Sequence, residues 1–384
     1  MTTSLVFRKC WWLGSSEVSL QKKLLGILIT LMVSVIGGLI FALIHFPLHW
    51  LLGPTTAALI CAKFLPIKLY WPVQIRNTGL IAIGYMLGAS FSLETLIDMG
   101  KQLPSMFVMT AVILVFSGLL GVVTTRYTGI PLRSTITGSV PGGLTQMLIL
   151  GEEMKNVDQT IVTFFQILRL IGVIFIVPLL TAIPFFKEHG SAETVSQGSH
   201  AAWSPTLIFV YVVIAISAAV LGKKIKLPTA FLLGPIIATA IFVIAGLPAP
   251  NLPHVVINIS QLFTGAYVGL MIQPTQLGNK TRTTFAAVIT SIVLVAFSLL
   301  LGLVLKWLYG IGLVTAFLSM APGGVDQMGI VAKETGASLP IMTSYQMFRV
   351  FFILFFVPPY LKWLFNTKWF ARLEEKLVKG RAKH

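Results

Sequence analysis

The chain has 384 residues, of which 56% are hydrophobic and 10% are charged, and its mean hydropathy is +0.89. Soluble proteins carry about 25% charged residues, so this composition excludes an ordinary soluble domain and indicates a polytopic membrane protein. The formal net charge of +16 does not indicate nucleic-acid binding, because the basic residues are dispersed over short loops and the C-terminal end. We therefore expect no nucleic-acid partner.

The chain begins with a basic leader, residues 1–23, which we expect to be retained because no signal-peptide cleavage pattern follows the first apolar run. A helix needs about 20 apolar residues to cross a bilayer. Five candidate spans precede a polar linker at 187–203, with a loop between the third and the fourth. They lie at about 24–44, 50–66, 74–92, 104–125 and 157–186.

A second series of five candidate spans follows the linker. These spans lie at about 205–222, 229–247, 254–272, 284–305 and 339–363. We therefore predict a first membrane repeat at 24–186, a second at 204–363 and a basic cytoplasmic tail at 364–384.

Each half also contains a segment whose apolar pattern is broken at its middle. We call residues 132–154 the first broken segment and residues 312–333 the second. Proline lacks an N–H group and glycine costs about 1 kcal/mol in a helix interior, so each segment is expected to form two half-helices that meet at a tip. The tips are Pro141, Gly142 and Gly143 in the first segment and Pro322, Gly323 and Gly324 in the second.

The two halves share residues at a nearly constant offset in the numbering. The Pro-Gly-Gly tip and the Gly53-Pro54 pair both recur at an offset of 181, the latter as Gly234-Pro235. Other pairs at this offset are Asn77 with Asn258, Gly84 with Gly265, Gly88 with Gly269 and Glu153 with Glu334. Gln166-x-x-Arg169 recurs as Gln346-x-x-Arg349 at an offset of 180. Such a long period indicates a duplicated unit of about 165 residues.

The distribution of positive charge predicts how the halves are oriented. If the broken segments crossed the membrane, the basic loops of the two halves would face opposite sides, which the positive-inside rule disfavours. If each segment enters and leaves on one side, nearly all basic loops become cytoplasmic. We therefore predict an all-α polytopic membrane protein with two inverted repeats of about five transmembrane helices, each with a broken, re-entrant helical hairpin. Both termini are expected to be cytoplasmic.

The tips are the predicted binding site. Half-helices of about nine residues reach about 14 Å, so both tips are expected near the membrane midplane. Inverted repeats with broken helices are typical of secondary transporters. The helix that restarts after each tip presents free N–H groups, which favour an anion. The polar side chains in these first turns are Thr145 and Gln146 in the first half and Asp326 and Gln327 in the second.

Structural explanations of these residues stay open. Thr145 and Asp326 can cap their half-helices. Asp326, a lone carboxylate, is also the candidate to carry a coupling proton or to bind sodium.

The Gln-x-x-Arg pairs, Gln166 with Arg169 and Gln346 with Arg349, also have two explanations. An arginine in an apolar span costs at least about 2.5 kcal/mol and needs a partner or a cavity. The arginines either clamp the carboxylate of a solute, or they bind hairpin carbonyl groups or one of the nearby acidic residues. Those acidic residues are Glu153, Glu334 and Asp326.

The duplicated motifs resemble a known family. The two Gly-Pro pairs and Pro-Gly-Gly-x-x-Gln-Met, at 141–147 and 322–328, are similar to those of the bacterial AbrB-type integral membrane proteins. The resemblance extends over roughly residues 25–365. It implies an inner-membrane protein that is often labelled a transporter, in a family that also carries the label of regulator of gene expression.

These observations predict a secondary active transporter of a small, anionic organic solute that works by alternating access. The alternative is a membrane sensor that affects gene expression through a cytoplasmic partner. The sequence has no nucleophile–base motif, and Cys10 and Cys61 offer no metal-ligand spacing, so we expect neither an enzyme nor a cofactor. The expected partners are the solute, membrane lipids and a second copy of the chain in a homodimer.

Overall fold

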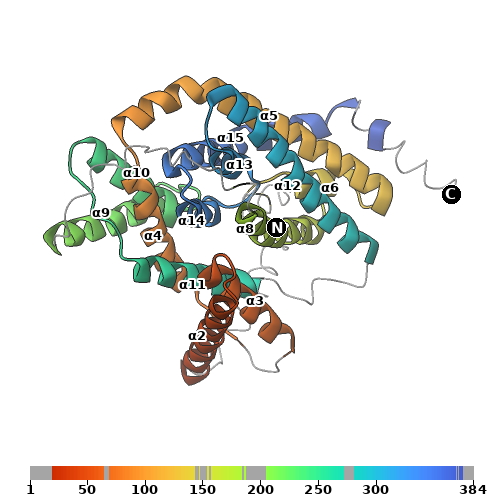
Figure 1. Cartoon of the computed structure of the whole chain (residues 1–384). Coiled ribbons are helices and arrows are strands. Elements are labelled where there is room, and N and C mark those ends of the chain that lie inside the picture. Colours follow the sequence, from red (N-terminus) through yellow and green to blue (C-terminus); the bar gives the residue numbers. More distant parts are fainter. Residues whose placement is uncertain are drawn as a thin grey trace. The chain divides into compact units, whose positions relative to one another are not determined.

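The computed structural model describes residues 20–64, 69–142, 147, 154, 157–183, 186, 205–271, 281–368, 370 and 372–374. All regular elements in these ranges are helical, which confirms the all-α fold class (Figure 1). The chain divides into two compact units, Met1–Gly79 with Ile257–Gln273 and Leu80–Val256 with Pro274–His384. The units do not coincide with the sequence repeats, because each unit takes helices from both halves.

The helices of the first half are α2 (Leu20–Leu43), α3 (His49–Phe64), α4 (Val73–Ala89), α5 (Leu93–Thr128), α6 (Leu132–Ser139) and α8 (Gln159–Ala182). Those of the second half are α9 (Pro205–Lys224), α10 (Ala230–Ile244), α11 (His254–Met271), α12 (Thr281–Tyr309), α13 (Leu313–Met320), α14 (Val325–Thr335) and α15 (Leu339–Phe365). The end of the predicted leader, from Leu20 onward, therefore belongs to α2, whereas the predicted linker lies outside the described residues.

Seven of the described helices, α2, α5, α8, α9, α11, α12 and α15, are long and apolar enough to cross a membrane. The other three predicted spans form shorter helices, with 16 residues in α3, 17 in α4 and 15 in α10. The lengths and composition are those of a multi-pass membrane protein.

The predicted loop around Asp98 is wrong, because these residues form the first turns of α5, a helix of 36 residues. A capping box starts this helix: Ser92 Oγ accepts from the N–H of Thr95, and Thr95 Oγ1 accepts from the N–H of Ser92. These bonds satisfy N–H groups at the helix end that would otherwise lack partners. Pro104, which the prediction placed at the helix start, instead lies inside the helix.

Close packing at glycines follows the sequence duplication in both units. In one unit, Gly84 of α4 lies against the carbonyl oxygen of Leu232 in α10; in the other, Gly265 of α11 lies against that of Leu51 in α3. Leu51 and Leu232 are themselves counterparts in the duplication, so the same contact occurs twice with the halves exchanged. A Cβ atom would clash at either glycine, so both allow a neighbouring helix to approach closely. Gly88 with Ile236 and Gly269 with Thr55 repeat the pattern.

The two ends of each broken segment lie together. The Ser338 N–H, just before α15, donates to Thr315 Oγ1 at the start of α13, at 3.0 Å. The Asp158 N–H, just before α8, donates to Ser134 Oγ at the start of α6, at 2.8 Å. A continuous helix of about 23 residues would hold such ends about 34 Å apart. The chain therefore folds back between Ser134 and Asp158 and again between Thr315 and Ser338.

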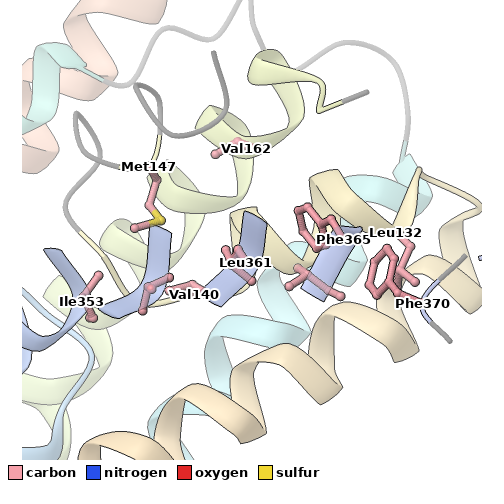
Figure 2. Close-up of a cluster of buried hydrophobic side chains, with 10 residues drawn as sticks. Leu132, Val140, Met147, Val162, Ile353, Leu361, Phe365 and Phe370 are labelled. Carbon is pink, nitrogen blue, oxygen red and sulfur yellow. The ribbon is translucent and has the colours of Figure 1, made fainter. Parts of the chain in front are cut away.

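The last part of α15 packs against the start of the first broken segment. Phe365 and Phe370 belong to one buried cluster with Leu132, as Figure 2 shows. Arg133 forms an ion pair with Glu374, with its Nε atom 3.4 Å from the carboxylate. The part of the predicted tail that the structure describes is therefore not simply solvated, because Phe370 is only 1% exposed.

Candidate functional site

Both broken segments unwind where the sequence places proline. Val140, which precedes Pro141, has φ −60° and ψ 126°, and Ala321, which precedes Pro322, has φ −55° and ψ 133°. Proline disfavours the helical conformation in the residue before it, so α6 and α13 must end at these positions. The last carbonyl groups of each half-helix are then left without helical partners.

In the first half, the Gln-x-x-Arg pair of α8 supplies partners for these carbonyl groups. Gln166 Nε2 lies 3.0 Å from the oxygen of Gly138 and 2.8 Å from that of Val140. Arg169 donates from Nη1 to Val140 at 2.8 Å and from Nη2 to Gly142 at 3.1 Å. Both side chains are buried. They hold the unwound backbone of the first tip in an otherwise apolar setting, where unsatisfied carbonyl groups are costly.

The second half repeats the arrangement with α15. Gln346 Nε2 lies 3.1 Å from the oxygen of Ala321. Arg349 donates from Nη1 to the oxygen of Met320 at 3.1 Å and from Nη2 to that of Gly323 at 3.2 Å. Arg349 Nη2 also donates to Gln346 Oε1. Each arginine thus binds hairpin carbonyl groups, which is one of the two explanations that the sequence allowed. A guanidinium has five N–H donors, so part of each remains for a ligand, and the clamp role stays a prediction.

The two guanidinium groups carry positive charge without a carboxylate partner among the described residues. Arg169 is 8% exposed and Arg349 is 4% exposed. Carbonyl dipoles offset only part of the cost of burying a charge. A bound anion would compensate the positive charge that the carbonyl groups of the tips do not offset.

Asp326 and Gln327 lie in the first turn of α14, and both are buried. Gln327 Oε1 accepts from the N–H of Gly324 at 3.4 Å, so Gln327 provides a partner for one N–H group at the start of this helix. The Asp326 carboxylate lies against Gly324, where a Cβ atom would clash with it. Its role with a coupling ion stays a prediction.

Several predicted site residues lie outside the described residues. These are Gly143, Thr145, Gln146 and the acidic residue Glu153. Pro141 and Gly142 of the same tip are described, and both are buried. The first tip is therefore defined here up to Gly142 and the second over its full length.

Two kinds of residue in the broken segments were not expected from the sequence. Ser134 and Thr315 join the ends of the broken segments, and they are counterparts in the duplication, which was a signal that could have identified them. Ser139, next to the first tip, is 3% exposed, and its hydroxyl group has no hydrogen-bond partner among the described residues. Its counterpart at position 320 is methionine, so the duplication carries no signal for it.

No group of three or more His, Cys, Asp or Glu side chains gathers within the described ranges in a way that could hold a metal ion. The elements that meet at the tips are instead apolar helices with isolated polar side chains. They define a multi-pass, all-α membrane protein with two broken helices.

The family follows from comparison with known proteins. The model of the family described as "Transition state regulatory protein AbrB" matches residues 50–365, so the chain belongs to the AbrB family. This confirms the resemblance that the repeated motifs indicated.

Two relatives are similar over nearly their full length. "Uncharacterized protein YhjN" of Bacillus subtilis is 25% identical over 351 residues, which cover 86% of this chain and 91% of the relative. "Putative regulator AbrB" of Escherichia coli is 25% identical over 317 residues, which cover 82% of this chain and 89% of the relative.

Proposed function

We propose that this protein is a secondary active transporter that moves a small organic anion by alternating access, with its site at the two tips. The observation that carries this proposal is the pair of buried guanidinium groups, Arg169 and Arg349, which have no carboxylate partner among the described residues. The tip carbonyl groups need hydrogen-bond donors but not a full positive charge, so the burial of these two charges is costly unless a ligand compensates them. Unwound helices near the membrane midplane, where we expect the two tips, are typical of transporter sites.

The contacts at the two ends of α15 support the inverted arrangement that the mechanism needs. This helix begins beside Thr315 of the second broken segment and ends beside Leu132 of the first. At 1.5 Å per residue its length is about 40 Å, enough to span a bilayer. The two broken segments would then enter the membrane from opposite sides, and each solute-facing tip would become accessible in turn.

We also propose a membrane, an orientation of the termini and a coupling group. We place the protein in the bacterial inner membrane with both termini in the cytoplasm, as the positive-inside rule favours. Asp326 is the proposed group that couples transport to protons or sodium, since it is a buried carboxylate in the first turn after a tip. The protein is not proposed to be an enzyme.

The test is thermal stabilisation of the purified protein by a library of small acids, amines and sugars, with and without sodium and at two pH values. A ligand at 100 times its dissociation constant adds about 2.7 kcal/mol of stability. We expect acids to stabilise the native protein and to lose this effect in Arg169→Gln and Arg349→Gln. Arg169→Lys, which keeps the charge but not the planar donor group, should bind acids weakly.

The matched control is Arg126→Gln, because this arginine is exposed in the last turn of α5. It should respond to acids as the native protein does. The absence of stabilisation by any acid would contradict the proposal. The sensor alternative would gain weight if both arginine variants kept full function in cells and a cytoplasmic protein bound the C-terminal segment.

A further inference from the structure

The two Gln-x-x-Arg pairs differ in whether the glutamine and the arginine bond to one another. In the second half, Arg349 Nη2 donates to Gln346 Oε1, so the pair closes on itself. In the first half this bond is absent, and Gln166 Oε1 and Arg169 Nε are buried without a hydrogen-bond partner among the described residues. Buried polar atoms without partners cost about 1–3 kcal/mol each. Because only one of two duplicated sites carries this cost, a ligand at the first tip is the simplest compensation.

The orientation of both groups is determined by the hairpin. Gln166 must turn its amide nitrogen toward the carbonyl oxygens of Gly138 and Val140, so its oxygen faces away from them. Arg169 uses Nη1 and Nη2 for the same tip, which leaves Nε. Both side chains donate to the Val140 oxygen and therefore lie side by side. The hydroxyl group of the adjoining Ser139 is a third buried polar group without a partner in the described part of the chain.

These buried atoms match a ligand that has both a hydrogen-bond acceptor and a hydrogen-bond donor. A carboxylate accepts from Arg169 Nε but cannot bond to Gln166 Oε1, which needs an N–H or O–H group. The positive charge of the arginines favours an O–H donor over a charged N–H donor. An ammonium group would be repelled by Arg169 and Arg349, whereas a hydroxyl group would not. A hydroxyl donor such as that of Ser139, the residue before Val140, would suit the second oxygen of the carboxylate.

We infer that the solute is a small 2-hydroxycarboxylate, held by Arg169 and Ser139 at its carboxylate and by Gln166 at its hydroxyl group. This inference rests on the proposed function and narrows its class of substrate. A plain carboxylate would leave Gln166 Oε1 unpaired. The hydroxyl group should therefore improve binding about ten-fold or more, in line with the cost of a buried acceptor without a partner.

The experiment compares matched acids on the full-length protein by thermal stabilisation and calorimetry: lactate with propionate, glycolate with acetate, and L-alanine as the amino analogue. Lactate and glycolate should bind about ten-fold tighter than their plain partners, and alanine should bind more weakly than lactate. Equal binding of the plain acids, or tighter binding of alanine, would overturn the inference and leave the proposed function standing. If no acid binds, the proposed function fails and the inference fails with it.

Gln166→Leu and its counterpart Gln346→Leu provide a matched pair of variants. Both lose hairpin hydrogen bonds, but only Gln166→Leu removes the unpaired acceptor. The ratio of lactate to propionate affinity should fall toward one in Gln166→Leu and stay high in Gln346→Leu. If Gln166→Leu does not fold, Ser139→Ala serves, because its hydroxyl group bonds to no described residue. It should weaken both acids several-fold, and unchanged affinity for both would count against the site.

Discussion

Phe116 of α5 and Phe297 of α12 stack face to face, with ring centroids 3.7 Å apart. The two positions differ in number by the same offset as the two tips, so each phenylalanine is the counterpart of the other in the duplication. An approximate two-fold axis between the two halves would produce such a contact, as it does in a symmetric dimer interface. Gly121 of α5 packs on Ile136 of α6, and Gly302 of α12 packs in the same way on Phe317 of α13. Each broken segment is therefore held by the equivalent helix of its own half.

The inverted arrangement predicts opposite labelling of two equivalent positions. Arg126 and Trp307 are counterparts at the ends of α5 and α12, and both are exposed. In a protein with Cys10→Ser and Cys61→Ser, a membrane-impermeant maleimide should label Arg126→Cys from the cytoplasmic side and Trp307→Cys from the other side. Labelling of both from one side would contradict the inverted model, whatever the solute is.

Close packing of the broken segments should be sensitive to added methyl groups. A Cβ atom on Gly121 would lie 2.8 Å from the Cα atom of Ile136 and one on Gly302 would lie 2.9 Å from that of Phe317. Gly121→Ala and Gly302→Ala should each lower the free energy of unfolding by about 1–3 kcal/mol. Gly118→Ala, in the same helix as Gly121 but facing open space, is the control and should raise it by up to about 1 kcal/mol. Thermal unfolding in detergent would measure all three.

The hydrogen bond that joins the ends of the second broken segment should protect the Ser338 amide. Thr315→Val keeps the shape of the side chain but removes the acceptor, which should cost about 1–3 kcal/mol. Hydrogen–deuterium exchange at Ser338 should accelerate, and Thr315→Ser should restore protection. Thr335→Val is the control, because that hydroxyl group bonds only within α14. Equal exchange in Thr315→Val and the native protein would refute this role.

The segment after α15 should contribute to stability. Phe370 is 1% exposed and packs with Leu132 at the start of the first broken segment. Phe370→Ala should therefore lower the free energy of unfolding by about 3–5 kcal/mol. Phe355→Ala, at a phenylalanine that is 65% exposed on α15, should change it much less in detergent. A similar loss in both variants would mean that the cluster at Phe370 does not anchor this segment.

The places where the chain must unwind could be predicted from local rules. Pro141 and Pro322 end the preceding half-helices in the structure as the sequence indicated, because the effect of proline on its neighbour does not depend on the rest of the fold. The start of α5 was missed for a related reason. Pro104 inside the helix looks like a boundary, and the capping box that actually starts the helix lies well before it, at Ser92.

The sequence by itself determined that the protein is helical and membrane-spanning, that it is duplicated, and that a Gln-x-x-Arg pair accompanies each tip. These features depend on composition, periodicity and spacing, which can be read from the order of the residues without knowing any tertiary contact. Only the tertiary structure decided what the arginines bind in the folded protein, and that Gln166 lacks the hydrogen bond that Gln346 makes. Two identical motifs cannot reveal such a difference, because it arises from the backbone and side chains that surround each motif in space.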